Sequence, residues 1–286
     1  DLSGSITIDG SSTVAPLSEA AAEQFQAENS GVRVTVGTSG TGGGFEKFCR
    51  GETDISDASR SIKDEEIQAC ADAGITYEEI TVGNDGLSVA VNLENDWAQC
   101  LTVEQLNAIW GPDSKVNNWN QVDPSFPDEE LVLFGPGTDS GTFDFFTEAI
   151  NGEEGAQRTD YNNVGEDDNQ AVTGVEGNVG GMAYFGFSFI QENEDKVRAV
   201  EVDSGNGCVA PSTETVQAGE YTPLGRGLFI YPSGEALQRP EVQGFARFYI
   251  ENNDAIAEQA LAIPLSDDQR EQANEQIDTL VSGGGE

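Results

Sequence analysis

Apolar and polar residues follow two different periods along the first quarter of the chain. Ser5–Asp9 alternates between them, as a half-buried strand does, whereas Ser11–Asn29 repeats its apolar residues every three or four positions, as an amphipathic helix does. The same patterns continue in strands predicted at Val32–Val36 and Asp54–Ile55 and in helices predicted at Phe45–Arg50 and Asp64–Ala73. Strands and helices that alternate in this way are typical of a parallel α/β sheet.

The rest of the chain continues this mixture of elements. Leu87–Asn92 is an apolar run typical of a buried strand, and we expect it to cross into a second lobe. A helix is predicted at Thr102–Trp110 because Thr102 and Gln105 have the spacing of a capping box. The other predicted elements are strands at Leu131–Phe134 and Leu228–Tyr231, the second being the return crossing, helices at Ser140–Ile150, Pro240–Asn252 and Ser266–Val281, and a flexible tail at Ser282–Glu286.

Length and composition allow two domains. The chain has 286 residues, of which 37% are hydrophobic, so each domain can bury its own core. All apolar runs are shorter than the ~18 residues of a membrane span, so no spanning helix is predicted. The first residues, Asp1–Gly4, resemble a mature or trimmed terminus more than a signal peptide.

The charge of the chain is strongly negative. There are 52 Asp and Glu residues against 13 Lys and Arg and no His, which gives a net charge of −39. Such a charge disfavours nucleic acids and anionic membranes as partners, because both would be repelled. The acidic residues are spread over the whole length, which predicts an acidic coat adapted to high salt, where the Debye length falls to ~3 Å at 1 M. An acidic protein from an ordinary habitat is the alternative.

Three segments place small hydroxyl residues and glycines at predicted strand-to-helix junctions. They are Gly10–Thr13, Gly37–Gly44 and Thr138–Thr142. Glycines let a ligand approach the backbone, hydroxyls donate hydrogen bonds, and a helix N-terminus offers unpaired N–H groups. Any one of these segments could simply cap a helix. Together they predict a receptor for an oxyanion that needs few formal charges.

A fourth segment, Asp57–Ser61, contains Arg60 directly after a predicted strand end. Arginine binds two oxygens of a tetrahedral oxyanion at once, so Arg60 is a candidate ligand. The alternative is that Arg60 pairs with a surface carboxylate such as Asp64.

The sequence gives little support for an enzymatic function. Without His there is no Ser-His-Asp or Cys-His arrangement, and Ser140 is one place out of register for a GxSxG elbow. The glycine-rich Gly40–Gly44 lacks the Lys-Ser/Thr of a phosphate-binding P-loop. We therefore predict no catalytic residue and no metal ligand, although a carboxylate metal site stays open.

These segments, in this order along nearly the whole chain, resemble the PstS family of phosphate-binding proteins, which serve phosphate ABC transporters. The combination of GSSTVAPL, DASR and DSGTF is specific to this resemblance. The segments that carry it are Ile8–Leu17, Ser39–Gly43, Asp54–Arg60, Gly135–Phe143, Gly181–Phe187 and Pro223–Tyr231.

The resemblance implies an α/β fold of the type II periplasmic-binding-protein kind. In this fold two lobes with mixed sheets flanked by helices close on a dehydrated phosphate. The first lobe would comprise residues 1–85 plus 227–286 and the second 86–226, joined by two hinge crossings.

The resemblance also implies a set of phosphate ligands. Ser12 would donate its hydroxyl and Thr13 its backbone N–H, and Ser39 or Thr41 would donate from the second loop. The opposite lobe would bind through hydroxyls and helix N–H groups. The full predicted set is Ser12, Thr13, Ser39, Thr41, Asp57, Ser59, Arg60, Asp139, Ser140, Gly141 and Thr142.

Two details of this set stay open. Some family members carry an Arg shortly before the Ser-Gly-Thr, whereas Gly135–Thr138 has none, and Arg60 is the candidate for that charge. Many members also use a carboxylate to accept the proton of the bound phosphate, which excludes fully ionised sulfate. Asp57 and Asp139 are both candidates for this acceptor.

The four cysteines allow three disulfide pairings, and four free thiols are the alternative. We favour Cys49–Cys70 and Cys100–Cys208, because each pair then lies within one predicted lobe. Disulfides imply an oxidising compartment outside the cytoplasm.

The expected function is high-affinity capture of inorganic phosphate and its delivery to the permease of an ABC transporter. We expect a monomer in the periplasm or at the cell surface, without cofactor or catalysis, and leave open an anchor upstream of Asp1. The alternatives are a receptor for another oxyanion such as sulfate or molybdate, a phosphatase or phosphotransferase, and an adhesion or sensing protein.

Overall fold

The computed structural model describes residues 1–283, and the chain within it forms two compact units. Unit 1 comprises Asp1–Asn84 and Gly227–Glu286, and unit 2 comprises Asp85–Arg226. The chain passes from one unit to the other in β4 (Ile80–Asn92) and returns in β12 (Gly225–Pro232). Asp85 lies in unit 2, whereas the sequence analysis placed it with the first lobe. The predicted α/β class, with mixed sheets flanked by helices, is confirmed.

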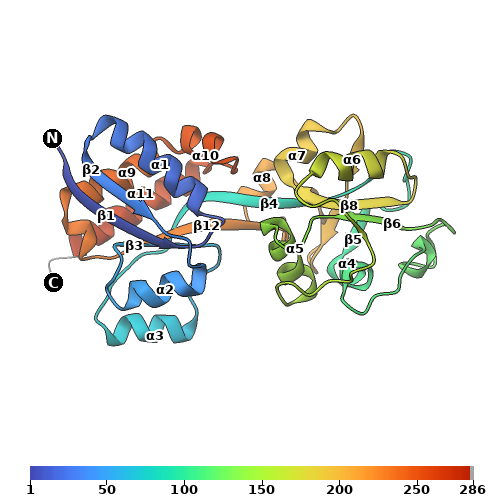
Figure 1. The fold of residues 1–286 in the computed structure, drawn as a ribbon, viewed down its shortest axis with the longest axis horizontal. Coiled ribbons are helices and arrows are strands. Elements are labelled where there is room, and N and C mark those ends of the chain that lie inside the picture. Colours follow the sequence, from blue (N-terminus) through green and yellow to red (C-terminus); the bar gives the residue numbers. More distant parts are fainter. Residues whose placement is uncertain (284–286) are drawn as a thin grey trace. The chain divides into compact units, whose positions relative to one another are not determined.

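Unit 1 is built on a mixed sheet with helices on both faces (Figure 1). Its strands follow the order β2-β1-β3-β12, in which β1 runs parallel to both neighbours and β12 antiparallel to β3. The larger core lies on the face covered by α1, α9, α10 and α11, and a smaller core lies under α2 and α3. The elements of unit 1 besides β4 and β12 are β1 (Ser3–Gly10), α1 (Ala15–Glu28), β2 (Gly31–Val36), α2 (Thr41–Cys49), β3 (Ile55–Ala58), α3 (Asp64–Asp72), α9 (Pro240–Glu251), α10 (Asn253–Ala260) and α11 (Asp267–Gly283).

Glycines let α2 pack directly against the end of β1. Gly10 has a φ of +144°, and a Cβ there would lie 2.1 Å from the carbonyl oxygen of Asp57. A Cβ on Gly44 would lie 2.5 Å from the Cα atom of Gly10. Helix α2 therefore begins at Thr41, and its predicted start at Phe45 was wrong. Helix propensity alone disfavours the three glycines of this first turn, but Gly44 is the one that the close packing on β1 requires.

Unit 2 contains a second mixed sheet and a separate three-stranded sheet. In the mixed sheet, β8 lies antiparallel to β4 and parallel to β6, and β6 is parallel to β7. The aromatic core includes Phe146 and Tyr184, whose rings stack with centroids 3.7 Å apart. The elements of unit 2 are β5 (Cys100–Thr102), α4 (Val103–Trp110), β6 (Val132–Gly135), α5 (Gly141–Asn151), β7 (Asn162–Asn163), α6 (Asp168–Glu176), β8 (Gly181–Gly186), α7 (Phe187–Glu192), β9 (Val197–Ala199), β10 (Glu201–Asp203), β11 (Cys208–Val209) and α8 (Thr213–Gln217).

The predicted disulfide pairing is confirmed. Cys49–Cys70 joins α2 to α3 in unit 1, and Cys100–Cys208 joins β5 to β11 in unit 2. The alternative of four free thiols is therefore wrong.

Several helix ends differ from their predictions. The capping box of α4 is present, with Thr102 and Gln105 each bonded to the other's backbone N–H. Helix α1 begins at Ala15 instead of Ser11, because a turn precedes it. Helix α11 continues through Gly283, so the first part of the predicted flexible tail is helical, and the last three residues lie outside the described part of the chain.

Within residues 1–283 the helices are too short or too polar to cross a bilayer.

Candidate anion-binding site

In unit 1 three of the predicted loops meet at the carboxyl ends of β1 and β3. Gly10 at the end of β1 lies beside Asp57 of β3, and the N–H of Ser11 donates to the Asp57 carbonyl at 2.9 Å. The N–H of Gly40 donates to the Gly10 carbonyl, also at 2.9 Å. The first, second and fourth polar segments of the sequence therefore lie side by side at one edge of the sheet.

The first loop is organised by Ser11, which the sequence analysis did not single out. Its Oγ accepts hydrogen bonds from the N–H groups of Thr13 at 3.1 Å and Val14 at 3.3 Å. The predicted donor N–H of Thr13 thus already has an acceptor within the loop. Ser12 is exposed at the tip of this turn, where its hydroxyl can reach a ligand.

The second loop separates the two alternatives Ser39 and Thr41. Ser39 donates both its N–H, at 3.0 Å, and its hydroxyl, at 2.5 Å, to the Asp9 carboxylate. Thr41, at the first residue of α2, shares its hydroxyl with Ser59, whose Oγ lies 3.2 Å away. The geometry therefore favours Thr41 as the donor from this loop and gives Ser39 a supporting position.

The Asp9 carboxylate holds the second loop in place by accepting hydrogen bonds from Ser39. The Lys47 ammonium donates to its carboxylate at 2.8 Å. Burial alone would raise the pKa of Asp9, but the hydrogen bonds from Lys47 and Ser39 and the Lys47 charge outweigh it and hold the pKa at about 2. Asp9 is therefore ionised over the whole physiological range and ties the loop to α2.

Arg60 lies against the start of α2. Its guanidinium forms two parallel hydrogen bonds with Glu66, at 2.8 and 3.1 Å, and its Cζ atom lies 5.6 Å from the Phe45 ring centroid. A Cβ on Gly42, in the first turn of α2, would lie 3.7 Å from its Nη2. A carboxylate partner, the kind of alternative expected from the sequence, is therefore present, and the described one is Glu66.

The Asp57 side chain lies in the core of unit 1. Its carboxyl group is fully buried, accepts a hydrogen bond from Ser18 at 2.9 Å, and Ser18 in turn lies 2.9 Å from the Tyr249 hydroxyl. Burial raises the pKa of Asp57 well above its usual value. Successive side chains of a strand point to opposite faces, and Asp57 points to the face covered by α1 and α9. The structure therefore does not support Asp57 as a direct ligand.

In unit 2 the predicted ligands lie at the N-terminus of α5. Ser140 is buried, and its Oγ accepts the N–H of Thr142 at 3.2 Å. Gly141 is exposed and Thr142 is half-buried, so this first turn can present N–H groups and a hydroxyl to a ligand. The loop before it is held by the Tyr161 hydroxyl, which donates to the Pro136 carbonyl at 2.7 Å.

Two carboxylates, Asp139 and Asp168, lie at the same edge of the sheet as this helix start. Asp139 is exposed immediately before Ser140. Because β6 and β7 are parallel, α6 begins at the same edge of the sheet as α5, and its first residue is the half-buried Asp168. Burial first, and then the charges of Glu166 and Asp167, raise the pKa of Asp168 to about 6. The segment Gly135–Thr142 itself contains neither Lys nor Arg.

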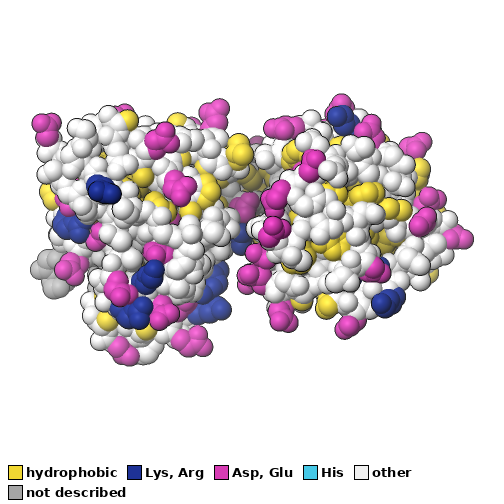
Figure 2. Space-filling view, viewed as in Figure 1, with side chains coloured by type: hydrophobic (Ala, Val, Ile, Leu, Met, Phe, Trp, Pro, Cys, Tyr) yellow, Lys and Arg dark blue, Asp and Glu magenta, His cyan; other side chains and the backbone are white. Residues whose placement is uncertain are grey.

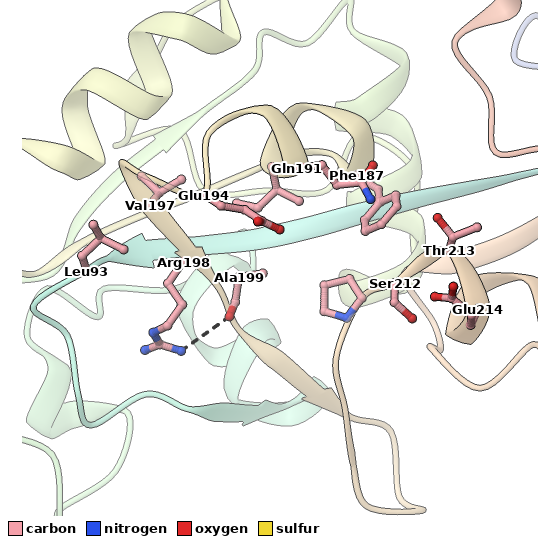
Figure 3. A pocket seen from close by; sticks show the side chains of 12 residues that line it. Leu93, Phe187, Gln191, Glu194, Val197, Arg198, Ala199, Ser212, Thr213 and Glu214 are labelled. Carbon is pink, nitrogen blue, oxygen red and sulfur yellow. Dashed lines mark hydrogen bonds between the residues drawn. The ribbon is translucent and has the colours of Figure 1, made fainter. Parts of the chain in front are cut away.

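A cavity of about 470 Å³ lies elsewhere in unit 2 (Figure 3). Its apolar wall includes Leu93, Phe187 and Val197, and it contains none of the predicted ligands. Arg198 at its side donates to the backbone carbonyls of Asn95 and Ala98. This cavity is therefore separate from the candidate anion-binding residues.

Sequence reasoning missed three charged residues of the site: Asp9, Lys47 and Glu66. Asp9 stood inside a quoted motif, and its place directly before the loop glycine was a usable signal. Nothing in the sequence separated Glu66 from its neighbours Asp64 and Glu65. Within residues 1–283, no group of three or more Cys, Asp or Glu side chains is placed to hold a metal ion.

Comparison with known proteins identifies the fold and then the family. A family model described as a PBP superfamily domain matches residues 1–253, which makes the chain a member of that superfamily. The chain is 47% identical to Protein SphX of Synechococcus elongatus over 91% of its own length and 77% of that protein. It is 40% identical to the phosphate-binding protein PstS of Staphylococcus saprophyticus over 97% of its length and 86% of that protein.

A solved structure agrees with these matches. The crystal structure of a possible phosphate binding protein from Planctomyces limnophilus superposes with a TM-score of 0.90 at 43% identity, covering 98% of this chain and 100% of that one. The chain belongs to the PstS family of phosphate-binding proteins.

Proposed function

We propose that this protein captures inorganic phosphate with high affinity outside the cytoplasm and delivers it to the permease of an ABC transporter. The proposal rests on family membership and is carried by one observation. The loop hydroxyls and Arg60 gather at one edge of the unit 1 sheet, where a parallel α/β sheet binds its ligand. The protein acts as a monomeric receptor, without turnover and without a cofactor.

Each unit supplies part of the proposed ligand set. Unit 1 contributes two hydroxyl groups from Thr41 and Ser59, which are already within 3.2 Å of each other. Arg60 adds the formal positive charge, and the exposed Ser12 adds a further hydroxyl donor. Unit 2 contributes Ser140, Gly141 and Thr142 at the start of α5.

Asp139 is the proposed acceptor of the phosphate proton. It is exposed beside Ser140, whereas the other candidate, Asp57, points into the core. A carboxylate that must accept a proton binds hydrogen phosphate and repels the fully ionised sulfate. Selectivity for phosphate is therefore expected to depend on Asp139.

Calorimetric titration of dialysed protein in high salt tests the proposed function. We expect one phosphate per chain with a micromolar or lower Kd, which corresponds to at least ~8 kcal/mol, and no displacement by sulfate. The Asp139→Asn variant should lose part of this selectivity. Absence of phosphate binding, or equal binding of sulfate, would overturn the proposal.

We propose further that the protein is adapted to high salt. The net charge of −39 and the Asp and Glu side chains scattered over the visible face of each unit support this (Figure 2). Salt screens their mutual repulsion, so the Tm should rise between 0.1 and 3 M NaCl. An unchanged Tm over this range would contradict the proposed adaptation and leave phosphate binding untouched.

A further inference from the structure

The Arg60–Glu66 pair differs from an ordinary surface ion pair in its geometry. The Nη1 atom of Arg60 donates to Oε1 of Glu66 at 2.8 Å, and Nη2 donates to Oε2 at 3.1 Å. The side chain of Arg60 is 29% exposed and that of Glu66 18% exposed, so solvent screens the pair only in part. Two parallel bonds fix the plane of the guanidinium as well as its position.

Glu66 is itself held in place from the other side. Its Oε1 accepts the backbone N–H of Lys63 at 2.9 Å, which is the capping bond at the start of α3. Burial alone would raise the pKa of Glu66, but the hydrogen bonds from Arg60 and Lys63 and the Arg60 charge lower it below its usual value. Glu66 is therefore a fixed, ionised carboxylate at neutral pH.

We propose that Glu66 is a positioning residue for phosphate binding, which holds the Arg60 guanidinium against the first turn of α2. This inference rests on the proposed function. The position of Gly42 shows where the guanidinium is held, since a Cβ there would lie 3.7 Å from Arg60 Nη2. Thr41, one residue earlier, is the hydroxyl donor proposed for the same ligand.

Positioning and simple electrostatics predict opposite effects of removing the Glu66 charge. A negative charge close to an anion site repels the anion, so its removal by Glu66→Gln would strengthen binding if charge alone mattered. If Glu66 positions Arg60, the variant weakens the two parallel bonds. The guanidinium still donates to the Ser61 carbonyl, but it gains conformational freedom, and the loss of that freedom must then oppose binding. The sign of the change therefore separates the two explanations.

Glu65 provides a matched control. It is the preceding residue in the first turn of α3, it is exposed, and Glu65→Gln changes the net charge by the same amount. In calorimetric titration with inorganic phosphate we expect Glu66→Gln to bind about tenfold more weakly than wild type, or about 1.4 kcal/mol. Glu65→Gln should bind as tightly as wild type or slightly more tightly. Phosphate binding by Glu66→Gln that equals or exceeds that of Glu65→Gln would overturn the inference.

A second measurement examines Arg60 without any ligand. In NMR spectra, with the Arg60 signal assigned by an Arg60→Lys variant, guanidinium rotation should be slow in wild type and in Glu65→Gln and fast in Glu66→Gln. Rotation that is equally fast in all three would overturn the inference even where phosphate binds. If the wild-type protein binds no phosphate, the proposed function fails, while the NMR signal still decides whether Glu66 orients Arg60.

Discussion

The two units present their candidate phosphate ligands in different ways. In unit 1 ion pairs support the candidate ligands: Glu66 holds Arg60, and the pair of Lys47 with Asp9 ties the second loop to α2, both at 2.8 Å. Unit 2 uses the N-terminus of α5, where the N-cap Ser140 orders the first turn and the loop before it has no cation. One region thus relies on oriented formal charge and the other on the backbone dipole of a helix.

This difference shows how an anion site can exist in a chain with a net charge of −39. In unit 1 each cation near the site is paired with a carboxylate that fixes its position. In unit 2 the donors are backbone and hydroxyl groups, which act at hydrogen-bond distance, where salt does not screen them. Neither region requires a local excess of positive charge.

The largest expected effect lies in the charged region. Arg60→Gln removes the charged donor of unit 1. A hydrogen bond to a charged group is worth about 1.5–3 kcal/mol, so phosphate should bind up to about a hundredfold more weakly. Calorimetric titration measures the change. Arg50→Gln is the control, since Arg50 is exposed and pairs only with nearby Glu46 and Glu52 among the ion pairs described for it. Binding by Arg60→Gln within twofold of that control would remove Arg60 from the ligand set.

The next effect concerns the stability of unit 1. The pKa of Asp9 is about 2 in the folded protein against an ordinary 3.8, so its ionised form favours folding. At 1.4 kcal/mol per pKa unit, Asp9 contributes about 2 kcal/mol above pH 4, which is lost as the pH falls from 3.8 to 2.

Urea unfolding of Asp9→Asn tests this contribution. The variant should be less stable than wild type by about 2 kcal/mol at pH 7, and the difference should shrink toward pH 2. Asp72→Asn, an exposed carboxylate of the same unit, should change stability little. A pH-independent difference for Asp9→Asn would show that the Asp9 charge is not the cause.

The helix-based region should show a smaller effect on binding. Ser140→Ala removes an N-cap, at a cost of about 1 kcal/mol in the free energy of unfolding. It also removes a proposed ligand hydroxyl, so phosphate should bind about tenfold more weakly.

Ser212→Ala separates these two effects. Ser212 caps α8 in the same unit and accepts the N–H of Thr215 at 3.0 Å, but it lies outside the proposed ligand set. Its removal should lower stability by a similar amount and leave the phosphate Kd unchanged. If both variants lose the same phosphate affinity, the loss in Ser140→Ala comes from the lower stability of unit 2 and not from a missing ligand hydroxyl.

The smallest expected effect concerns the carboxylates of unit 2. The pKa of Asp168 is about 6 in the folded protein, above the ordinary 3.8, so its ionised form opposes folding. This penalty develops as the pH rises from 3.8 to 6 and is complete above pH 6. Because Asp168 is partly exposed, we expect only about 1 kcal/mol.

Asp168→Asn should therefore be more stable than wild type above pH 6 and equal to it below pH 4. Urea unfolding at the two pH values measures this difference. Asp195→Asn, at an exposed position of unit 2, serves as the control. If Asp168→Asn is instead less stable than wild type at pH 7, the ionised carboxylate stabilises the folded protein. That result would contradict the raised pKa of Asp168.

Local features of the sequence predicted much of the fold. Thr102 and Gln105 lie within one turn, so their capping box forms wherever that helix packs. The disulfides followed from a division into two lobes, because only one pairing keeps Cys49 with Cys70. The start of α2 was missed because helix propensity disfavours glycine, whereas the close contact of Gly44 with Gly10 exists only in the folded sheet.

By itself, the sequence determined the α/β class, the family and the loops that carry the candidate ligands, because these depend on residue types at fixed short spacings. Only the tertiary structure decided which side chains of those loops point outward. Strand alternation turns Asp57 into the core, Ser39 donates to the Asp9 carboxylate, and Glu66 forms two hydrogen bonds with Arg60. Direction and partner depend on contacts between segments distant in the chain, and local spacing carries no information about them.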